Sequence, residues 1–346
     1  MFIRIIIFIL SVIISTNFNM YSSKYSTDNS GFQVNNIRNS YIINEINDKA
    51  ELAARESIRK HKVKDNTVSK PKEYEKNKIG IRNYDFEMGN ELSQRIYTNI
   101  SNYGRSVSFY AVSLKDRFEF GYNPKDVYET ASTIKAPYIL YCIKEIEKGN
   151  GSFDELKVYE QRHFIYGSGI IQNTSFGTVY TLKQLIYYTI NFSDNIAYNM
   201  LHDRFGIDGY NNMLEELGCK HYYMDGRYIW GKADPESAAL VWQEIYKYSN
   251  RSEYGKYYLN LLINALYNFI APGVPEYVTA HKSGWIEEQS HDTGIVFGER
   301  PYTVVIMVEN GGGWSGTYEI QLISSMVKEV MDQYDIYSRN MDLQKI

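Results

Sequence analysis

Apolar and polar positions follow strand-like and helix-like periods from about residue 86 onward. Alternating segments at SVSFYAVSL (106–114) and RFEFGYNP (117–124) predict two strands, and NELSQRIYTNIS (90–101) predicts a helix before them. Near the end of the chain, three more strands are predicted at VTAHKSGWI, HDTGIVFG and YTVVIMVEN, and then a helix at TYEIQLISSMVKEVMDQY. Strands at both ends of this region predict one sheet assembled from the two ends of a domain.

The middle of the chain has a helical pattern. ASTIKAPYILYCIKEIEKGNG (131–151) is apolar almost all round, so we expect a central, buried helix that stops near Gly149. Residues 153–270 are predicted to be mostly helices and loops. The expected fold class is therefore α/β (α+β): an antiparallel sheet with flanking helices plus an all-helical subdomain, and an active site in the cleft between them.

Polar sequence precedes this domain, which we expect to span residues 86–346. Residues 21–85 are rich in Asn, Ser and Lys and are predicted to be a flexible linker, apart from a short helix near residues 46–62. Residues 1–20 combine one early arginine with an apolar run from Ile5 to Ile14, which is short for a membrane span but typical of a signal peptide. No A-x-A-like cleavage site is evident, so an N-terminal anchor is the alternative. We expect a secreted or membrane-tethered protein.

Charge and composition exclude some functions. The net charge is −4, and residues 24–78 are basic, so the remainder of the chain is more acidic still and is unsuited to bind nucleic acid through its overall field. The basic stretch could lie against an anionic membrane or wall polymer, although a solvated linker is the simpler interpretation. The histidines and cysteines lack metal-ligand spacing, so we expect no metal and no cofactor. We also expect a monomer. Whether Cys142 and Cys219 form a disulfide stays open.

Ser132 and Lys135 are the first candidates for chemistry. They are three positions apart at the start of the buried helix, so their side chains share a face and can meet. The same S-x-x-K spacing recurs at Ser57, Ser69 and Ser325, where we interpret it as coincidence. At Ser132 a nucleophile is plausible if burial or nearby positive charge lowers the pKa of Lys135 enough to make it a base. The alternative is a helix-capping serine followed by a lysine that extends to solvent.

Two further tripeptides favour the catalytic interpretation. Ser193-Asp194-Asn195 lies between two predicted helices, and Lys282-Ser283-Gly284 lies in a predicted strand. Each is weak alone, but the order S-x-x-K, S-D-N, K-[ST]-G is a combined signature of class A β-lactamases and penicillin-binding proteins. With the stretches ETASTIKAP, YGSGIIQ, DRFGIDG, AHKSGWI and HDTGIVFG, the chain resembles the class A serine β-lactamase family of penicillin-recognising serine hydrolases, in particular a clostridial-type branch.

This resemblance implies a role for each residue of the signature. Ser132 would form an acyl-enzyme with a β-lactam or a D-Ala-D-Ala-like peptide, Lys135 would relay its proton, and Ser193 would protonate the leaving nitrogen. Substrate binding would fall to Asn195, Lys282, Ser283 and Gly284, and the backbone N–H groups of Ser132 and Trp285 would form the oxyanion hole.

One departure from the family pattern concerns deacylation. The loop glutamate that hydrolyses the acyl-enzyme in class A enzymes is missing, and only Asp225 and Asp234 are acidic between Glu216 and Glu236. Deacylation could therefore be slow, which leaves two rivals to a β-lactamase: a D,D-peptidase acting on cell-wall peptides, and a covalent β-lactam sensor with little turnover. Family members often carry an arginine on the strand after K-[ST]-G to help bind a carboxylate, and HDTGIVFG has none. His291 and Asp292 are interpreted as structural, since no G-x-S-x-G elbow accompanies them.

Overall fold

The computed structural model describes residues 78–82, 86, 88–102, 107–224, 230–309 and 316–343, all of which belong to one folded unit, residues 55–346. The predicted leader, most of the predicted linker with its short helix, and Asp225 lie outside the described residues. None of the helices within the described ranges is both long and apolar enough to span a membrane.

The predicted helices and strands of the catalytic region are all present. The strands are β1 (Ile79–Arg82), β2 (Val107–Ser113), β3 (Glu119–Tyr122), β4 (Tyr128–Glu129), β5 (Leu156–Val158), β6 (Val179–Thr181), β7 (Tyr223–Met224), β8 (Gly231–Ala233), β9 (Val278–Trp285), β10 (Gln289–Phe297) and β11 (Tyr302–Glu309). The helices are α3 (Asn90–Asn102), α4 (Lys135–Glu147), α5 (Leu182–Asn191), α6 (Asn195–Phe205), α7 (Asp208–Glu216), α8 (Pro235–Arg251), α9 (Glu253–Ile263) and α10 (Thr317–Leu343). Four short 3₁₀ turns accompany them: η1 (Ala131–Ile134), η2 (Gln161–His163), η3 (Ile171–Asn173) and η4 (Ala271–Gly273).

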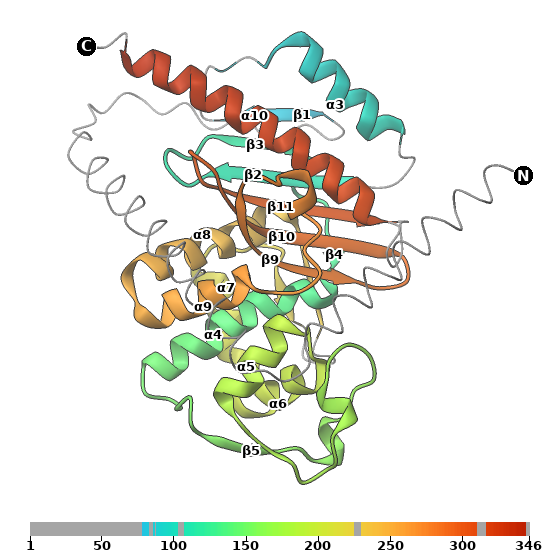
Figure 1. Ribbon diagram of the computed structural model, residues 1–346, viewed down its shortest axis with the longest axis vertical. Coiled ribbons are helices and arrows are strands. Elements are labelled where there is room, and N and C mark those ends of the chain that lie inside the picture. Colours follow the sequence, from blue (N-terminus) through green and yellow to red (C-terminus); the bar gives the residue numbers. More distant parts are fainter. Residues whose placement is uncertain are drawn as a thin grey trace, which may run out of the picture. The chain divides into compact units, whose positions relative to one another are not determined.

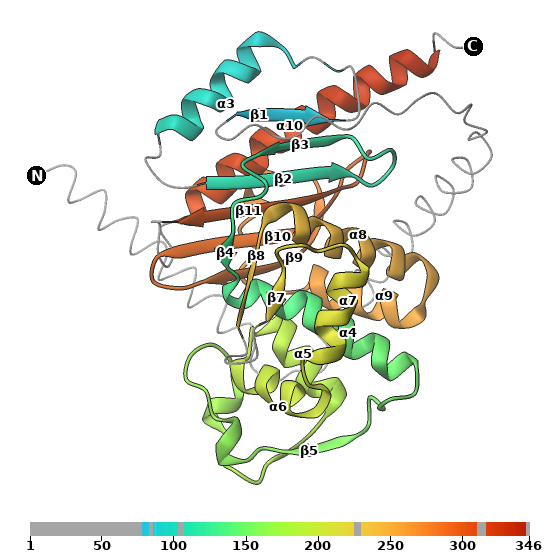
Figure 2. The same cartoon turned by 180° about the vertical axis from the view of Figure 1, so that it is seen from behind.

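The main sheet has six antiparallel strands in the order β1-β3-β2-β11-β10-β9, so both ends of the domain contribute to it, as predicted. Alternate residues of β11 face opposite layers: Val304 and Ile306 join a core with α3 and α10, while Val305 and Met307 join a core with α4 and α8. Helix α10 lies in front of the sheet in Figure 1 and behind it in Figure 2, and α8 does the reverse. Both faces of the sheet are therefore covered.

Strand β1 corrects the predicted start of the domain. Residues 79–82, which the sequence assigned to the linker, pair with β3 at the edge of the sheet. The strand is only four residues long and has two apolar residues, so its pattern is weak. Its stability comes from tertiary contacts: Arg82 forms ion pairs with Glu119 at 2.8 Å and with Glu236 of α8 at 2.6 Å.

The helices below the sheet surround α4. Of its thirteen residues ten are buried, as the all-round apolar pattern predicted, and the chain leaves the helix through Gly149 at φ = 88°. Figure 2 shows α4, α5, α6 and β5 extending beyond β9, the last strand of the sheet. This arrangement puts the junction of α5 and α6 close to the free edge of β9, where the three sequence motifs meet.

Candidate active site

Ser132 lies in a tight turn between the sheet and the central helix. It belongs to η1, and α4 begins only at Lys135, so the serine precedes the helix instead of opening it. Ser132 is the partly exposed residue of this turn; the other three are buried. The turn is fixed from behind by Thr130, whose backbone N–H and hydroxyl both donate to the carbonyl of Gly231 in β8.

Lys135 is fully buried and surrounded by oxygen atoms. Its Nζ lies 2.6 Å from the Ser193 carbonyl and 2.6 Å from Asn195 Oδ1, both of which can only accept hydrogen bonds. The Ser132 Oγ lies at 3.1 Å, as the i, i+3 spacing predicted. A neutral amine has two N–H donors and one lone pair. Once the two N–H groups are donated to the carbonyl and the amide oxygen, the lone pair is left for the Ser132 hydroxyl.

The electrostatic setting favours this neutral amine. Burial lowers the pKa of Lys135 well below its usual value, and the positive charge of Lys282 lowers it further, while Asp194 opposes both effects. The pKa of Lys282 is also lowered by burial, to about 8, with Asp292 acting in the opposite direction. Two lysines with lowered pKa values therefore lie on either side of one hydroxyl, that of Ser193, which is 3.2 Å from each Nζ.

The Ser193-Asp194-Asn195 segment is held in a strained turn before α6. Ser193 has φ = 52°, a region that L residues seldom adopt and that often marks functional sites. Asp194 fixes this turn with both carboxylate oxygens: Oδ1 accepts from the N–H groups of Ile196 and Ala197, and Oδ2 accepts from those of Ile170 and Ile171. Its role is structural, and it connects α6 to a loop more than twenty residues away.

That loop, YGSGIIQ at 166–172, needs two glycines to approach the site. A Cβ on Gly169 would lie 2.3 Å from Asp194 Cγ, and a Cβ on Gly167 would lie 2.7 Å from Asn195 Nδ2. Asn195 Nδ2 donates one of its two hydrogens to the Tyr166 carbonyl at 3.3 Å, so the second remains for a substrate carbonyl. The sequence drew attention to this stretch only through the family resemblance.

The third motif lies on the free edge of the sheet. Gly284 packs directly against the Ser132 turn, because a Cβ there would come within 2.5 Å of the Ser132 backbone nitrogen. Lys282 Nζ donates to the Ser283 carbonyl at 2.8 Å, so that carbonyl is turned away from β10. Within a strand the N–H and C=O groups of every second residue point to the same side, so the Trp285 N–H also faces this edge, near the Ser132 N–H. Two donors for an oxyanion are thus close together.

The five side chains of Ser132, Lys135, Ser193, Asn195 and Lys282 therefore form one connected polar network. A family model described as the "Beta-lactamase enzyme family" matches residues 91–334, which is most of the chain. The chain belongs to this family.

Solved structures of similar fold agree with the assignment to the β-lactamase enzyme family. PBP-A has a TM-score of 0.65 and 22% identity over 70% of this chain and 97% of its own. A β-lactamase from Sphaerobacter thermophilus DSM 20745 has a TM-score of 0.64 and 22% identity, again over 70% and 97%. A mutant of PBP-A described as an acyl-enzyme complex with penicillin-G has a TM-score of 0.64 and 22% identity with the same coverage. No curated protein matches the sequence, and the clostridial-type branch stays a prediction.

Asp234 is not a ready substitute for the loop glutamate that this chain lacks. This aspartate caps α8 by accepting from the Ser237 N–H at 2.6 Å, and its other oxygen lies 2.6 Å from His221 Nδ1. Each carboxylate oxygen already has a partner and the side chain is buried, which favours a structural role for Asp234 over activation of water. Beside its oxygen partners, Lys135 also has two aromatic neighbours: the Trp230 and Tyr198 ring centroids lie 5.3 and 5.8 Å from its Nζ.

His291 and Asp292 have structural roles, as predicted, although they lie in strand β10 and not in a turn. His291 Nε2 is 2.9 Å from the Glu129 carbonyl, and burial lowers its pKa to about 4, which keeps the ring neutral. Both cysteines are buried free thiols. In the described part of the chain, no group of His, Cys, Asp and Glu side chains could hold a metal ion.

Proposed function

We propose that this serine β-lactamase-like hydrolase is acylated at Ser132 by β-lactams and releases the product slowly. The position of Lys135 is the observation that carries the proposal: a buried amine with two hydrogen-bond acceptors at 2.6 Å and the Ser132 hydroxyl at 3.1 Å. The penicillin-G adduct of the PBP-A mutant supports a β-lactam as the acyl donor.

The geometry supports the following route to acylation. Lys135 takes the Ser132 proton as the Oγ attacks the lactam carbonyl carbon, and the resulting oxyanion is stabilised by the N–H groups of Ser132 and Trp285. When the tetrahedral intermediate collapses, the C–N bond breaks and the nitrogen needs a proton. Ser193 supplies it and is reprotonated from Lys135, which is 3.2 Å away and now charged. Lys282, on the other side of Ser193, attracts the carboxylate of the substrate.

Among the described residues no base for deacylation is identified, and Asp225 lies outside them. Asp234 is committed to its helix cap and to His221, and the Trp230 and Tyr198 rings lie beside Lys135. We therefore infer that water attacks the acyl-enzyme slowly and that the adduct persists for minutes or longer. The same chemistry suits an enzyme that acts on D-Ala-D-Ala-like wall peptides, because the nucleophile, the relay and the carboxylate site are shared by both reactions.

A timed intact-mass experiment tests this function. The protein is mixed with benzylpenicillin and sampled from milliseconds to hours; one adduct should form and decay slowly. Ser132→Ala should form no adduct. Ser325→Ala is the matched control, because Ser325 has the same S-x-x-K spacing. It should behave as wild type, since Ser325 belongs to α10 and not to the proposed site. An adduct that persists in Ser132→Ala would refute the nucleophile. An adduct that clears within milliseconds would refute slow deacylation.

Turnover separates the rival substrates. Steady hydrolysis of nitrocefin would support a β-lactamase, release of D-Ala from a wall pentapeptide would support a peptidase, and a stoichiometric burst that stops would support a sensor. We also propose that the protein is a monomer exported by residues 1–20 and that it acts outside the membrane. Recovery of the activity in the cytosolic fraction would argue against export.

A further inference from the structure

His281 and Asp292 form a fully buried pair that the proposed mechanism does not use. They lie on the neighbouring strands β9 and β10, and His281 Nδ1 is 3.0 Å from Asp292 Oδ1. Side chains alternate along a strand, so His281 and the buried Ser283 point to the face of β9 opposite Lys282. Burying polar or charged groups is costly unless their hydrogen bonds are satisfied, so the contacts of this pair indicate its charge state.

The contacts of Asp292 match an ionised carboxylate. Its Oδ2 accepts from the backbone N–H groups of Phe269 and Ile270, at 2.7 and 3.1 Å. Its Oδ1 accepts from the Thr293 N–H at 2.9 Å. A carboxylate only accepts hydrogen bonds, and here three backbone donors point at its two oxygen atoms. The ring nitrogen of His281 beside Oδ1 must therefore carry a proton.

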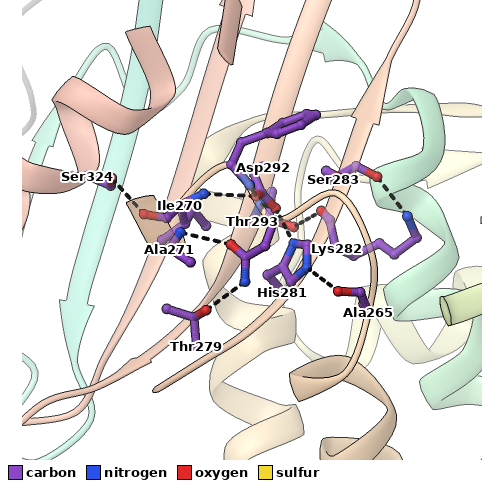
Figure 3. A network of polar contacts seen from close by, with 12 residues as sticks. Ala265, Ile270, Ala271, Thr279, His281, Lys282, Ser283, Asp292, Thr293 and Ser324 are labelled. Carbon is purple, nitrogen blue, oxygen red and sulfur yellow. Dashed lines mark hydrogen bonds and ion pairs between the residues drawn. The ribbon is translucent and has the colours of Figure 1, made fainter. Parts of the chain in front are cut away.

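The second ring nitrogen of His281 faces another atom that can only accept. Nε2 lies 3.2 Å from the carbonyl oxygen of Ala265. A neutral imidazole has one N–H group and one lone pair, so one of its nitrogens would direct a lone pair at an oxygen atom in a buried site. The doubly protonated imidazolium donates to both. Figure 3 shows His281 between Ala265 and Asp292, with Lys282 next to it on the strand.

We propose that His281 is a buried imidazolium and a positioning residue, which holds the 265–270 segment against β9 and offsets the negative charge of Asp292 at Lys282. The part that concerns Lys282 rests on the proposed function. The pair holds the segment at both of its ends, because His281 donates to the Ala265 carbonyl and Asp292 accepts from two N–H groups at the other end. The connection from α9 to β9 is thereby tied to the strand that carries Lys282.

Lys282 is the site residue whose charge this pair affects. Asp292 raises the pKa of Lys282, while burial lowers it, to about 8. The other charged groups that act on the two lysines of the site are Lys135 of α4 itself and Asp194, which precedes α6. An imidazolium beside Asp292 opposes the effect of the carboxylate, so Lys282 loses its proton at a lower pH than it would beside Asp292 alone. The pH range in which Lys282 attracts a carboxylate therefore depends on His281.

Nitrogen NMR tests the charge of His281 without any substrate. In protein labelled with ¹⁵N-histidine, the two ring nitrogens of an imidazolium both carry a proton and have similar shifts, whereas those of a neutral ring differ widely. The His281 signals are identified by their loss in His281→Asn or His281→Gln. At pH 7 they should be those of an imidazolium, and His291, whose pKa is lowered to about 4, should be neutral in the same spectrum. A neutral His281 would overturn the proposal, whether or not the protein is acylated.

The pH profile of acylation tests the link to Lys282. His281→Asn keeps an N–H group for Asp292 but carries no charge, so the alkaline fall in the rate of acylation by benzylpenicillin should move up by about one pH unit. His281→Gln, which keeps a donor for the Ala265 carbonyl, should show the same shift. His291→Asn is the matched control: it replaces a buried imidazole that is already neutral, so the fall should stay at its wild-type position.

A purely structural His281 gives a different result. Its replacement would lower the stability or the overall rate, but it would leave the position of the alkaline fall unchanged. An unmoved fall in both His281 variants would thus overturn the link to Lys282 while leaving the acyl-enzyme proposal in place. If the wild-type protein forms no adduct, the proposed function fails and the link fails with it, and the NMR result alone decides the charge of His281.

Discussion

At the scale of single residues, the reactivity that we propose for Ser132 depends on the hydrogen bonds around one amine, the Lys135 Nζ. The Lys135 Nζ lies 2.6 Å from two oxygen atoms that can only accept hydrogen bonds, and donation to both directs the lone pair of the neutral amine toward Ser132. A charged Lys135 would instead donate a hydrogen bond to the Ser132 Oγ. This bond engages a lone pair of the oxygen and makes it a weaker nucleophile. The protonation state of this lysine therefore separates a resting site from a reactive one.

Replacing Lys135 with arginine tests this dependence. Lys135→Arg keeps a positive charge but cannot accept a proton, so we expect acylation by benzylpenicillin to slow by about 10³-fold, within the range of general-base contributions. Stopped-flow labelling with a fluorescent penicillin measures the rate. Lys148→Arg, an exposed position at the C-cap of α4, should leave it unchanged. A loss smaller than threefold in Lys135→Arg would contradict the base assignment.

The pH profile of acylation should have limits set by both lysines. Toward acid the rate falls as Lys135 becomes protonated; burial lowers the pKa of this group, so the fall begins well below the pKa of an ordinary lysine. Toward alkali the rate falls near pH 8, because Lys282, with a pKa of about 8, loses the charge that attracts a carboxylate. Lys282→Arg should abolish the alkaline fall, since arginine stays charged. If the acylation rate of Lys282→Arg still fell near pH 8, the alkaline decrease would belong to the titration of another group.

At the scale of elements, the site is assembled by loops whose contacts bridge distant parts of the chain. Asp194 accepts four backbone N–H groups, two from its own helix α6 and two from Ile170 and Ile171. This clamp holds the 166–172 loop against the Ser193 turn. Only glycine at position 169 allows the two backbones to approach so closely.

Two glycine substitutions separate backbone strain from this close contact. Gly177→Ala places a Cβ in open space at φ = 89° and should cost about 1–2 kcal/mol of unfolding free energy without changing acylation. Gly169→Ala adds a clash with Asp194 and should cost at least about 2 kcal/mol more, because it breaks buried hydrogen bonds, and it should slow acylation. Urea unfolding and the labelling rate measure the two effects. Equal losses in both variants would show that the clamp is unimportant.

Sequence reasoning reached the order of the main helices and strands and the meeting of the three motifs, but not strand β1 or the contacts that hold the motifs together. The spacing of Ser132 and Lys135 predicts their contact because it is local to one turn. The Asp194 clamp and the burial of Ser283 could not be predicted, since they depend on segments that lie far apart in the sequence. Asp234 was a candidate base because the sequence alone does not distinguish an aspartate that caps a helix from one whose carboxylate is free. Trp230 gave no signal at all, since a tryptophan is usually a core residue.

At the scale of the whole domain, the proposed site lies at one edge of the sheet, and strand β1, which contributes to stability, lies at the other. Strand β9, which carries Lys282, is at one edge, and β1 is at the other, five strands away. The polar sequence around β1 concealed it within the predicted linker, yet its pairing with β3 and the ion pairs of Arg82 with Glu119 and Glu236 make it part of the fold. Changes at β1 should thus affect stability and leave the reaction intact.

Two truncations test this separation. A protein of residues 78–346 retains β1 and should unfold at the temperature of the full-length chain, whereas residues 86–346 should lose about 2–4 kcal/mol, because one strand pairing and two partly buried ion pairs disappear. Arg82→Ala in the full chain should account for less than half of that loss, which separates the ion pairs from the strand. The acylation rate constant of the folded fraction, measured at low temperature, should be the same in all of these proteins, because none of the described residues before Ser132 is hydrogen-bonded to the side chains of the proposed site. If removing residues 78–85 slowed acylation without lowering stability, β1 would be coupled to the site across the sheet, and the division between the two edges would be wrong.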